Sequence, residues 1–266
     1  MLNQIFTDQI SLGLAQAAVT IALALVVMAI ARWEAIHLER EIVVALMRGL
    51  VQVVIVGAAL VLLLQGPDWT SVFILAGMTL AAATISSRRA KGIRGAYKVS
   101  LYGIGFGSLV VIAPMTWLGV IDPALSSLVP VGSMLIANSM NSNALALDRF
   151  KGEVVSHVGQ IEAGLALGGE PKRIVTPYVR AAVQASLIPR IDNLRSLGIV
   201  WIPGVMAGMI LAGTDPIYAA IYQFVVIAMI FAASGITSLM STLLIRQYAF
   251  SEAEQLVLRP EKAGGK

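Results

Sequence analysis

The chain contains no cysteine and only two histidines among its 266 residues. The absence of cysteine excludes a disulfide framework and a thiolate metal site, and two histidines are too few for a histidine-rich metal centre. Charged residues are scarce as well, because Asp, Glu, Lys and Arg make up 13% of the chain, whereas a soluble domain has about 25%. With 58% hydrophobic residues and a mean hydropathy of +0.83, the composition predicts an integral membrane protein.

The sequence also lacks the residue sets that several classes of membrane protein need. No Gly-x-x-x-x-Gly-Lys-Ser/Thr stretch is present, so the chain has no loop of the usual kind for nucleotide phosphates. The apolar segments hold no His, Asp or Glu, which argues against an integral-membrane enzyme and against an ion-coupled carrier. The net charge of +4 comes from basic residues in particular connections, which indicates membrane orientation and not nucleic-acid binding.

Seven segments are apolar enough to be transmembrane helices, and most are long enough for a hydrocarbon core of about 30 Å. They are Ile10–Ala31, Ile42–Leu64, Val72–Ser86, Val99–Val120, Val129–Leu147, Leu194–Ala212 and Ile217–Ile245. The pattern predicts an all-α integral membrane protein of about seven transmembrane helices. Residues 1–250 are expected to form a single transmembrane domain, and residues 251–266 a loose polar C-terminal tail.

Connections that contain Lys or Arg alternate along the chain with connections that contain neither. Ser87 to Lys98 holds five basic residues, for example, whereas Ile121 to Leu128 holds none. Because basic connections stay on the cytoplasmic side, this alternation predicts an outer N-terminus, an inner C-terminus and an odd number of spans. The polar stretch from Asp148 to Asn193 then lies inside.

This polar stretch, Asp148–Asn193, is too patterned to be only a loop. Apolar residues recur at near-helical spacing between Val154 and Leu167, with polar residues between them, so an amphipathic helix is expected. Gly168-Gly169 should end it in a left-handed turn, with positive φ at Gly168. Pro171 can start a short helix and Thr176-Pro177 interrupts it. The pattern predicts helix, elbow, short helix, second elbow and helix.

The elbow carries a family resemblance. The residues from Glu162 to Gly168 read EAGLALG and resemble the EAA loop of ABC-transporter permeases, in which Glu-Ala-Ala, three residues and Gly precede a coupling helix. From about Leu46 to Arg246 the chain is similar to the FetB-like iron-export permeases, which include the membrane subunit of the plant aluminium-tolerance half-transporter. The similar stretches are IEAGLALG, SLIPRIDNLRSLGIVWIPGVMAGMILAGTDP and IYQFVVIAMIFAASGITSLMSTLLIRQ. Two departures, Gly164 at the third EAA position and SLIP in place of an early Ile-x-Leu-Pro, favour this branch over ordinary importers.

The resemblance implies the permease subunit of an ABC transporter that exports iron or another metal ion. Its implied partners are an ABC-type ATPase, which would bind ATP and Mg²⁺, and a second copy of the chain. Residues 148–193 would be the cytoplasmic coupling region between the fifth and sixth segments. The implied ATPase-docking residues are Glu162, Ala163, Gly168, Gly169, Glu170, Pro171, Lys172 and Arg173. The alternatives are an ABC permease for another small substrate, such as a nucleotide sugar, and an ATP-independent channel or carrier.

The fifth segment is rich in Ser and Asn. In helical register Met134, Asn138 and Asn141 lie along one face, and side-chain amides are costly in hydrocarbon unless they are paired or wet. That face should line either a substrate path or a helix contact held by hydrogen bonds, and the resemblance favours the path. The candidate path residues are Ser133, Met134, Asn138, Asn141, Met206 and Met209.

The sixth segment combines proline, glycine and methionine. Gly204-x-x-x-Gly208 permits a close helix approach, and Pro203 should bend the helix. With Gly213 these residues form the expected packing and bending set. The two methionines offer thioether groups to a passing metal ion, although methionine in an apolar helix more often fills space. No firm metal site is predicted.

Overall fold

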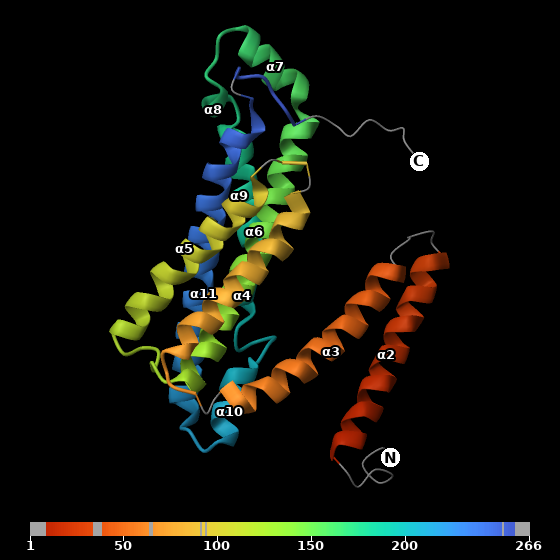
Figure 1. The fold of residues 1–266 in the computed structure, drawn as a ribbon, viewed down its shortest axis with the longest axis vertical. Coiled ribbons are helices and arrows are strands. Elements are labelled where there is room, and N and C mark those ends of the chain that lie inside the picture. The colour runs from red at the N-terminus through yellow and green to blue at the C-terminus, as the bar shows by residue number, and fades with distance from the viewer. Residues whose placement is uncertain are drawn as a thin grey trace. The chain divides into compact units, whose positions relative to one another are not determined.

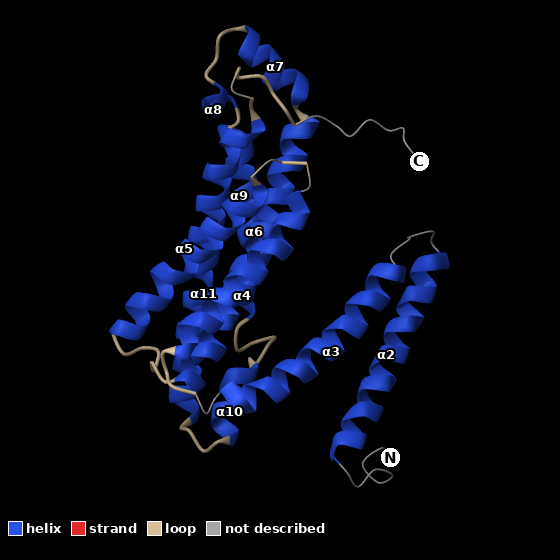
Figure 2. Cartoon of the chain, viewed as in Figure 1, coloured by secondary structure: helices blue, strands red, loops and turns tan. Residues whose placement is uncertain are grey.

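The structure is a computed structural model that describes residues 9–33, 39–63, 66–90, 92, 93, 95–251 and 253–258. All regular elements in these residues are helices (Figure 2), which confirms the predicted all-α class. The chain divides into two compact units, Met1–Gly66 and Pro67–Lys266. Several residues of the predicted basic connections lie outside the described part, namely His37, Lys91, Arg94, Arg259, Lys262 and Lys266.

The first unit is a pair of long apolar helices. They are α2, Gln9–Trp33, and α3, Glu39–Leu63, and they correspond to the first two predicted segments. Both helices are long and apolar enough to cross a hydrocarbon core of about 30 Å.

The second unit is a bundle of five long helices that run side by side along its length (Figure 1). They are α4 Thr70–Ser87, α5 Ala96–Trp117, α6 Leu125–Ser156, α9 Thr176–Ser196 and α11 Pro216–Ile245. Shorter elements complete it: α7 Val158–Ala166, α8 Pro171–Ile174, α10 Gly204–Leu211 and the 3-10 turns η1 Arg88–Ala90 and η2 Arg246–Ala249. At one end, called the tip here, lie α7, α8 and the last described residues. The opposite end holds α10 (Figure 1).

Five helices of the described residues are long and apolar enough to cross a membrane, namely α2, α3, α4, α5 and α11. The helices α6 and α9 have 32 and 21 residues, so at 1.5 Å per residue they reach a similar length. Both contain more polar side chains and pack against α11. Seven spans with the N-terminus outside therefore stay a prediction.

The predicted sixth segment, Leu194–Ala212, is wrong as a continuous helix. The helix α9 ends at Ser196, residues 197–203 form a turn, and α10 covers only Gly204–Leu211. Gly198 adopts a φ of +76°, a conformation that glycine allows readily, and this breaks the chain direction. Pro203 is extended and precedes α10, so it starts a helix instead of bending one.

The glycines of this region do not pack as expected. A Cβ atom at Gly204 or Gly208 would meet no atom within 4 Å, so the close helix approach is not made within the described chain. Gly213, with a φ of +90°, follows the end of α10 and turns the chain toward α11. A contact of Gly204 and Gly208 with a second subunit stays a prediction.

The close approach is made instead between α5 and α11. A Cβ atom at Gly107 would lie 2.9 Å from both the carbonyl oxygen of Ala233 and the backbone nitrogen of Thr237. A Cβ atom at Gly103 would collide with the Ser241 side chain. The glycines of α5 therefore allow backbones to approach closely, as small residues do at helix contacts in membranes.

Candidate functional site

The predicted elbow lies at the tip and ends α7. Gly168 has a φ of +79°, which confirms the predicted left-handed conformation. Its N–H donates to the carbonyl oxygen of Leu165 at 2.9 Å, and the Gly169 N–H donates to that of Gly164 at 3.0 Å. These two bonds form a Schellman motif with Gly168 at the left-handed position. The second elbow is smaller, because only Val175 separates α8 from α9.

Packing explains why Gly164 occupies the third EAA position. A Cβ atom at Gly164 would lie 3.2 Å from Cδ1 of Ile174 on α8, which is tighter than most side-chain contacts. A Cβ atom at Gly169 would lie 2.9 Å from the Gly164 carbonyl oxygen. Gly164 and Gly169 thus let α8 fold back against α7, so the departure from Glu-Ala-Ala follows from the tightness of this elbow.

The predicted docking residues come together at the tip, and most face outward. Glu162, Ala163, Gly168, Gly169, Glu170, Lys172 and Arg173 are exposed. Pro171 is buried, so it positions α8 and offers no surface of its own. The Arg173 Nε lies 2.9 Å from a carboxylate oxygen of Glu170, within one turn. Leu167, which the sequence reading left out, is 89% exposed at the point where α7 ends.

A hydrophobic core lies directly beneath the elbow and ties it to the bundle. Its fully buried members include Phe150 of α6, Ile161 of α7, Val175 before α9 and Ile245 of α11. The ring of His157, at the α6–α7 junction, stacks on Tyr178 of α9 with centroids 4.9 Å apart. These contacts join segments that are distant in the sequence. The tip is therefore packed as one unit with α6, α9 and α11.

The end of the chain packs on the same core. Leu256 and Leu258 are buried, the Ser251 N–H donates to the Gln255 carbonyl oxygen at 2.8 Å, and the Val257 N–H donates to that of Ala249 at 2.8 Å. The described part of the predicted tail is therefore held in place, and its expected looseness is wrong for residues 253–258.

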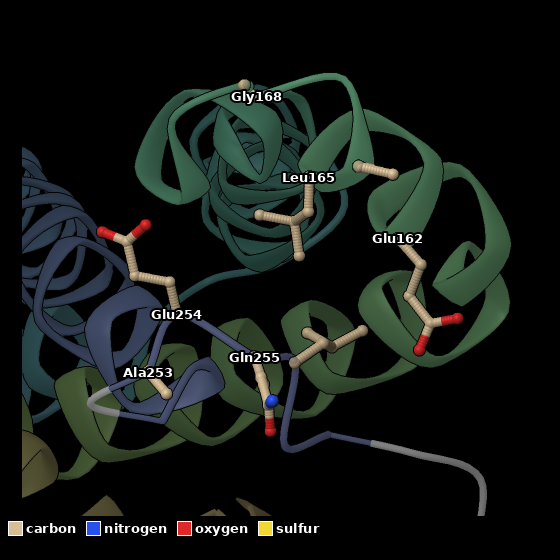
Figure 3. Close-up of a pocket in the computed structure, with 9 residues that line it drawn as sticks. Glu162, Leu165, Gly168, Ala253, Glu254 and Gln255 are labelled. Carbon is tan, nitrogen blue, oxygen red and sulfur yellow. The ribbon is translucent and has the colours of Figure 1, made fainter.

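A pocket of about 770 Å³ opens between the elbow and this terminal segment. Figure 3 shows Leu165 near its centre, with Glu162 of α7 and Glu254 of the terminal segment on opposite sides. Gly168 and Gly169 complete the wall on the elbow side. The elbow and the C-terminal segment thus present one common surface at the tip.

A second set of polar residues lies within the bundle. Asn138 on α6 faces Arg190 on α9, and Nη1 of Arg190 donates to the Asn138 side-chain oxygen. The Arg190 Nε donates to the Ser142 hydroxyl at 3.2 Å, and the Asn138 amide donates to the Met134 carbonyl oxygen at 2.7 Å. The predicted polar face of the fifth segment is therefore matched by an arginine that the sequence reading had placed outside the bilayer.

Asn138 and Arg190 open into a cavity of about 250 Å³. Its other lining residues are Met134, Asn193, Trp201, Ile227, Ile230 and Phe231. Two predicted path residues, Met134 and Asn138, are thus brought together here.

The remaining predicted path residues lie elsewhere. Asn141 is exposed and lines a separate hollow with Arg89 and Asp148. Ser133 donates to the Pro130 carbonyl oxygen at 2.8 Å, within its own helix. Met206 and Met209, on α10, are half-buried and do not line the Arg190 cavity. The backbone N–H of Met206 donates to the side-chain oxygen of buried Gln223 at 3.2 Å, which fixes the start of α10 on α11.

Within the described residues no group of three or more His, Asp or Glu side chains is placed to hold a metal ion. Some buried polar groups are instead paired between helices. The buried Asn143 amide of α6 donates to Ser86 of α4 at 2.6 Å and to Ser100 of α5 at 2.9 Å. Ser186 of α9 donates to Ser238 of α11 at 3.0 Å. Asn143 and Ser186 therefore join neighbouring helices through side-chain hydrogen bonds.

Residues 14–250 match the model of the uncharacterised protein family UPF0014. The chain belongs to the UPF0014 family. A relative named "Probable iron export permease protein FetB", from Escherichia coli strain K12, is 29% identical over 241 residues, which cover 90% of this chain and 93% of the relative. The resemblance drawn from the elbow and its flanks is therefore confirmed.

The chain is also similar to two plant proteins. The rice "UPF0014 membrane protein STAR2" is 30% identical over 239 residues, or 88% of this chain and 84% of the relative. The Arabidopsis thaliana "Protein ALUMINUM SENSITIVE 3" is 26% identical over 246 residues, or 92% and 90%. No solved structure matches the chain. The family and the apolar helices together make the chain a multi-pass membrane protein.

Proposed function

We propose that this chain is the membrane-spanning subunit of an ABC transporter that exports iron or another metal ion. The observation that carries the proposal is membership of a family in which a relative named "Probable iron export permease protein FetB" matches over most of both chains. In this account a separate ATPase subunit binds ATP and Mg²⁺, and two copies of the chain pair in the membrane. The metal ion is cargo, so a permanent metal site is not required.

The tip is the proposed ATPase-docking surface. Leu167 supplies an exposed apolar anchor, and Glu162, Lys172 and Arg173 are exposed charged residues of the same tip. Interfaces take most of their binding energy from a few apolar or aromatic anchors, while peripheral charges set orientation. The Schellman turn at Gly168 fixes the direction in which α8 and Leu167 point.

The core beneath the elbow supports transmission from the ATPase to the bundle. When the ATPase moves α7 and α8, the buried contacts of Ile161 and Val175 displace α6 and α9 together, because a packed core transmits displacement instead of absorbing it. The helices α6 and α9 carry Asn138 and Arg190, which line the cavity. Movement of the docked ATPase at the tip is thus transmitted through α6 and α9 to the cavity.

Reconstitution tests this function directly. Vesicles that contain the permease and an ABC-type ATPase, with ATP on the ATPase side, should move labelled iron away from that side, supplied either as Fe²⁺ or as its citrate complex. Movement should stop with a non-hydrolysable ATP analogue. Equal movement without the ATPase subunit would favour an ATP-independent channel or carrier.

A further inference from the structure

The cavity within the bundle has the wrong charge for a bare metal cation. Arg190 is the one charged residue among those that line it, and no acidic side chain does so. The nearest acidic residue in sequence, Asp192, lies 3.8 Å from Arg195, and no carboxylate of the described chain pairs with Arg190. An unpaired guanidinium repels cations and attracts anions, and the effect is stronger where water is scarce.

The guanidinium also has unused hydrogen-bonding capacity. An arginine side chain has five N–H donors, and within the described chain Arg190 uses its Nε and one Nη1 donor, toward Ser142 and Asn138. Asn138 contacts both sides, because its oxygen accepts from Arg190 and one N–H of its amide donates to the Met134 carbonyl oxygen. Asn138 therefore holds the guanidinium in place while further donors remain for a ligand.

The other residues that line the cavity suit an organic ligand that carries an oxyanion group. Asn193 offers a side-chain amide that has no partner among the described residues, and Trp201 offers an indole N–H. Ile227, Ile230 and Phe231 form the apolar side. A small number of placed donors within an apolar wall is typical of small-molecule sites.

We propose that this cavity is an oxyanion-binding site that recognises the cargo through a carboxylate or phosphate group held by Arg190. This inference rests on the proposed transport function. It means that the metal is exported as an anionic complex and not as a bare cation. Arginine suits the role because its planar fork of donors matches carboxylate and phosphate oxygens. Asn193 and Trp201 complete the site.

The test is direct binding to the purified full-length permease in nanodiscs, without ATPase and without ATP. The probes are radiolabelled citrate, the labelled iron–citrate complex, pyrophosphate and Fe²⁺ kept reduced. Wild type should bind at least one oxyanion probe saturably, and Arg190→Gln should bind it at least about tenfold more weakly, since a hydrogen bond to a charged group is lost. Binding of citrate or of pyrophosphate tells whether the recognised group is a carboxylate or a phosphate.

The matched control is Arg195→Gln, the same substitution on the same helix at a side chain that is 78% exposed. It should bind the anion as wild type does. Arg190→Lys, which keeps the charge, should retain part of the affinity. If Arg190→Gln does not fold, Asn193→Leu replaces it, and a several-fold loss of affinity is expected because that variant removes only a free amide.

Three results would overturn the proposal. One is binding of Fe²⁺ alone that Arg190→Gln leaves unchanged or strengthens. Another is anion binding that neither Arg190→Gln nor Asn193→Leu weakens. The third is a wild type that binds none of the anion probes; if Arg190→Gln then also loses its dimer, Arg190 belongs to a contact between subunits. Because the assay contains no ATPase, none of these results contradicts the proposed ABC function. Conversely, failure of an ATPase to bind the permease would not contradict the proposed anion site.

Discussion

Arg190 on α9 donates a hydrogen bond to the side-chain oxygen of Asn138 on α6. These two helices flank the elbow, since α6 precedes α7 and α9 follows α8. The contact therefore joins, inside the bundle, the two helices that a docked partner would move at the tip. Pro189, immediately before Arg190, lies within α9 and removes one backbone donor, which makes a bend easiest next to this contact.

Asn138→Leu and Asn141→Leu are predicted to behave differently. Asn138→Leu removes one of the two side-chain acceptors of the half-buried Arg190 and leaves only Ser142, at a cost of about 1–3 kcal/mol. The apparent melting temperature in detergent should fall, and transport should be lost. Asn141 is exposed, so Asn141→Leu should remain near wild type in both measurements. Equal effects of the two substitutions would contradict the assignment of only Asn138 to the cavity.

The close contact of α5 with α11 gives a second prediction. Gly107→Ala places a Cβ atom 2.9 Å from two backbone atoms of α11, which cannot yield as a flexible side chain can. Overpacking of this kind costs about 1–3 kcal/mol. The apparent melting temperature should therefore fall for Gly107→Ala. In Gly105→Ala the new Cβ atom meets only Thr79 Cγ2 at 3.7 Å, so this control should melt as wild type does, and a matching loss there would count against the packing explanation.

The sequence predicted the elements whose signal is local. The elbow follows from the turn chemistry of Gly168-Gly169, and its left-handed φ was predicted for that reason. The apolar helices α2, α3, α4, α5 and α11 follow from hydropathy alone. Gly168-Gly169 and long apolar runs act through neighbouring residues, so no tertiary information is required to find them.

The sequence could not predict the features that depend on packing. The helix α9 carries Arg180, Arg190 and Asp192, so hydropathy placed it outside the bilayer, whereas it packs along α6 and α11. Its pairing with Asn138 joins residues 52 positions apart. The buried Leu256 and Leu258 stand in a polar stretch of short length, where composition alone indicates a loose tail.

Membrane orientation can be tested with single cysteines, because the native chain has none. Ser126, at the start of α6, and Arg89, just after α4, are exposed, whereas Ala90 is buried and would be a poor site. An impermeant maleimide should label Ser126→Cys in intact cells and Arg89→Cys only after lysis. Labelling in the reverse order would place the basic connection outside and invert the topology.

Leu167 is predicted to anchor the ATPase. Leu167→Ala removes apolar contact at an exposed position, and truncation of an anchor residue weakens binding by about tenfold or more. Leu211 is the matched control, because it is 88% exposed on the far end of the second unit. Co-purification of the ATPase should fall for Leu167→Ala and stay unchanged for Leu211→Ala. An equal fall in both would indicate a general loss of folded protein.

The most direct test of the coupling elbow is the amount of ABC-type ATPase that co-purifies with Gly168→Val. Valine at a φ of +79° is strained by about 1–3 kcal/mol, so the turn should open and α8 should point elsewhere. Gly119→Val imposes the same strain, at a φ of +73° on the opposite end of the second unit, and neither position crowds a new Cβ atom. We predict that both variants reach the membrane and that only Gly168→Val loses its ATPase and ATP-driven transport. A Gly168→Val permease that keeps both would contradict the role of the elbow as the docking device.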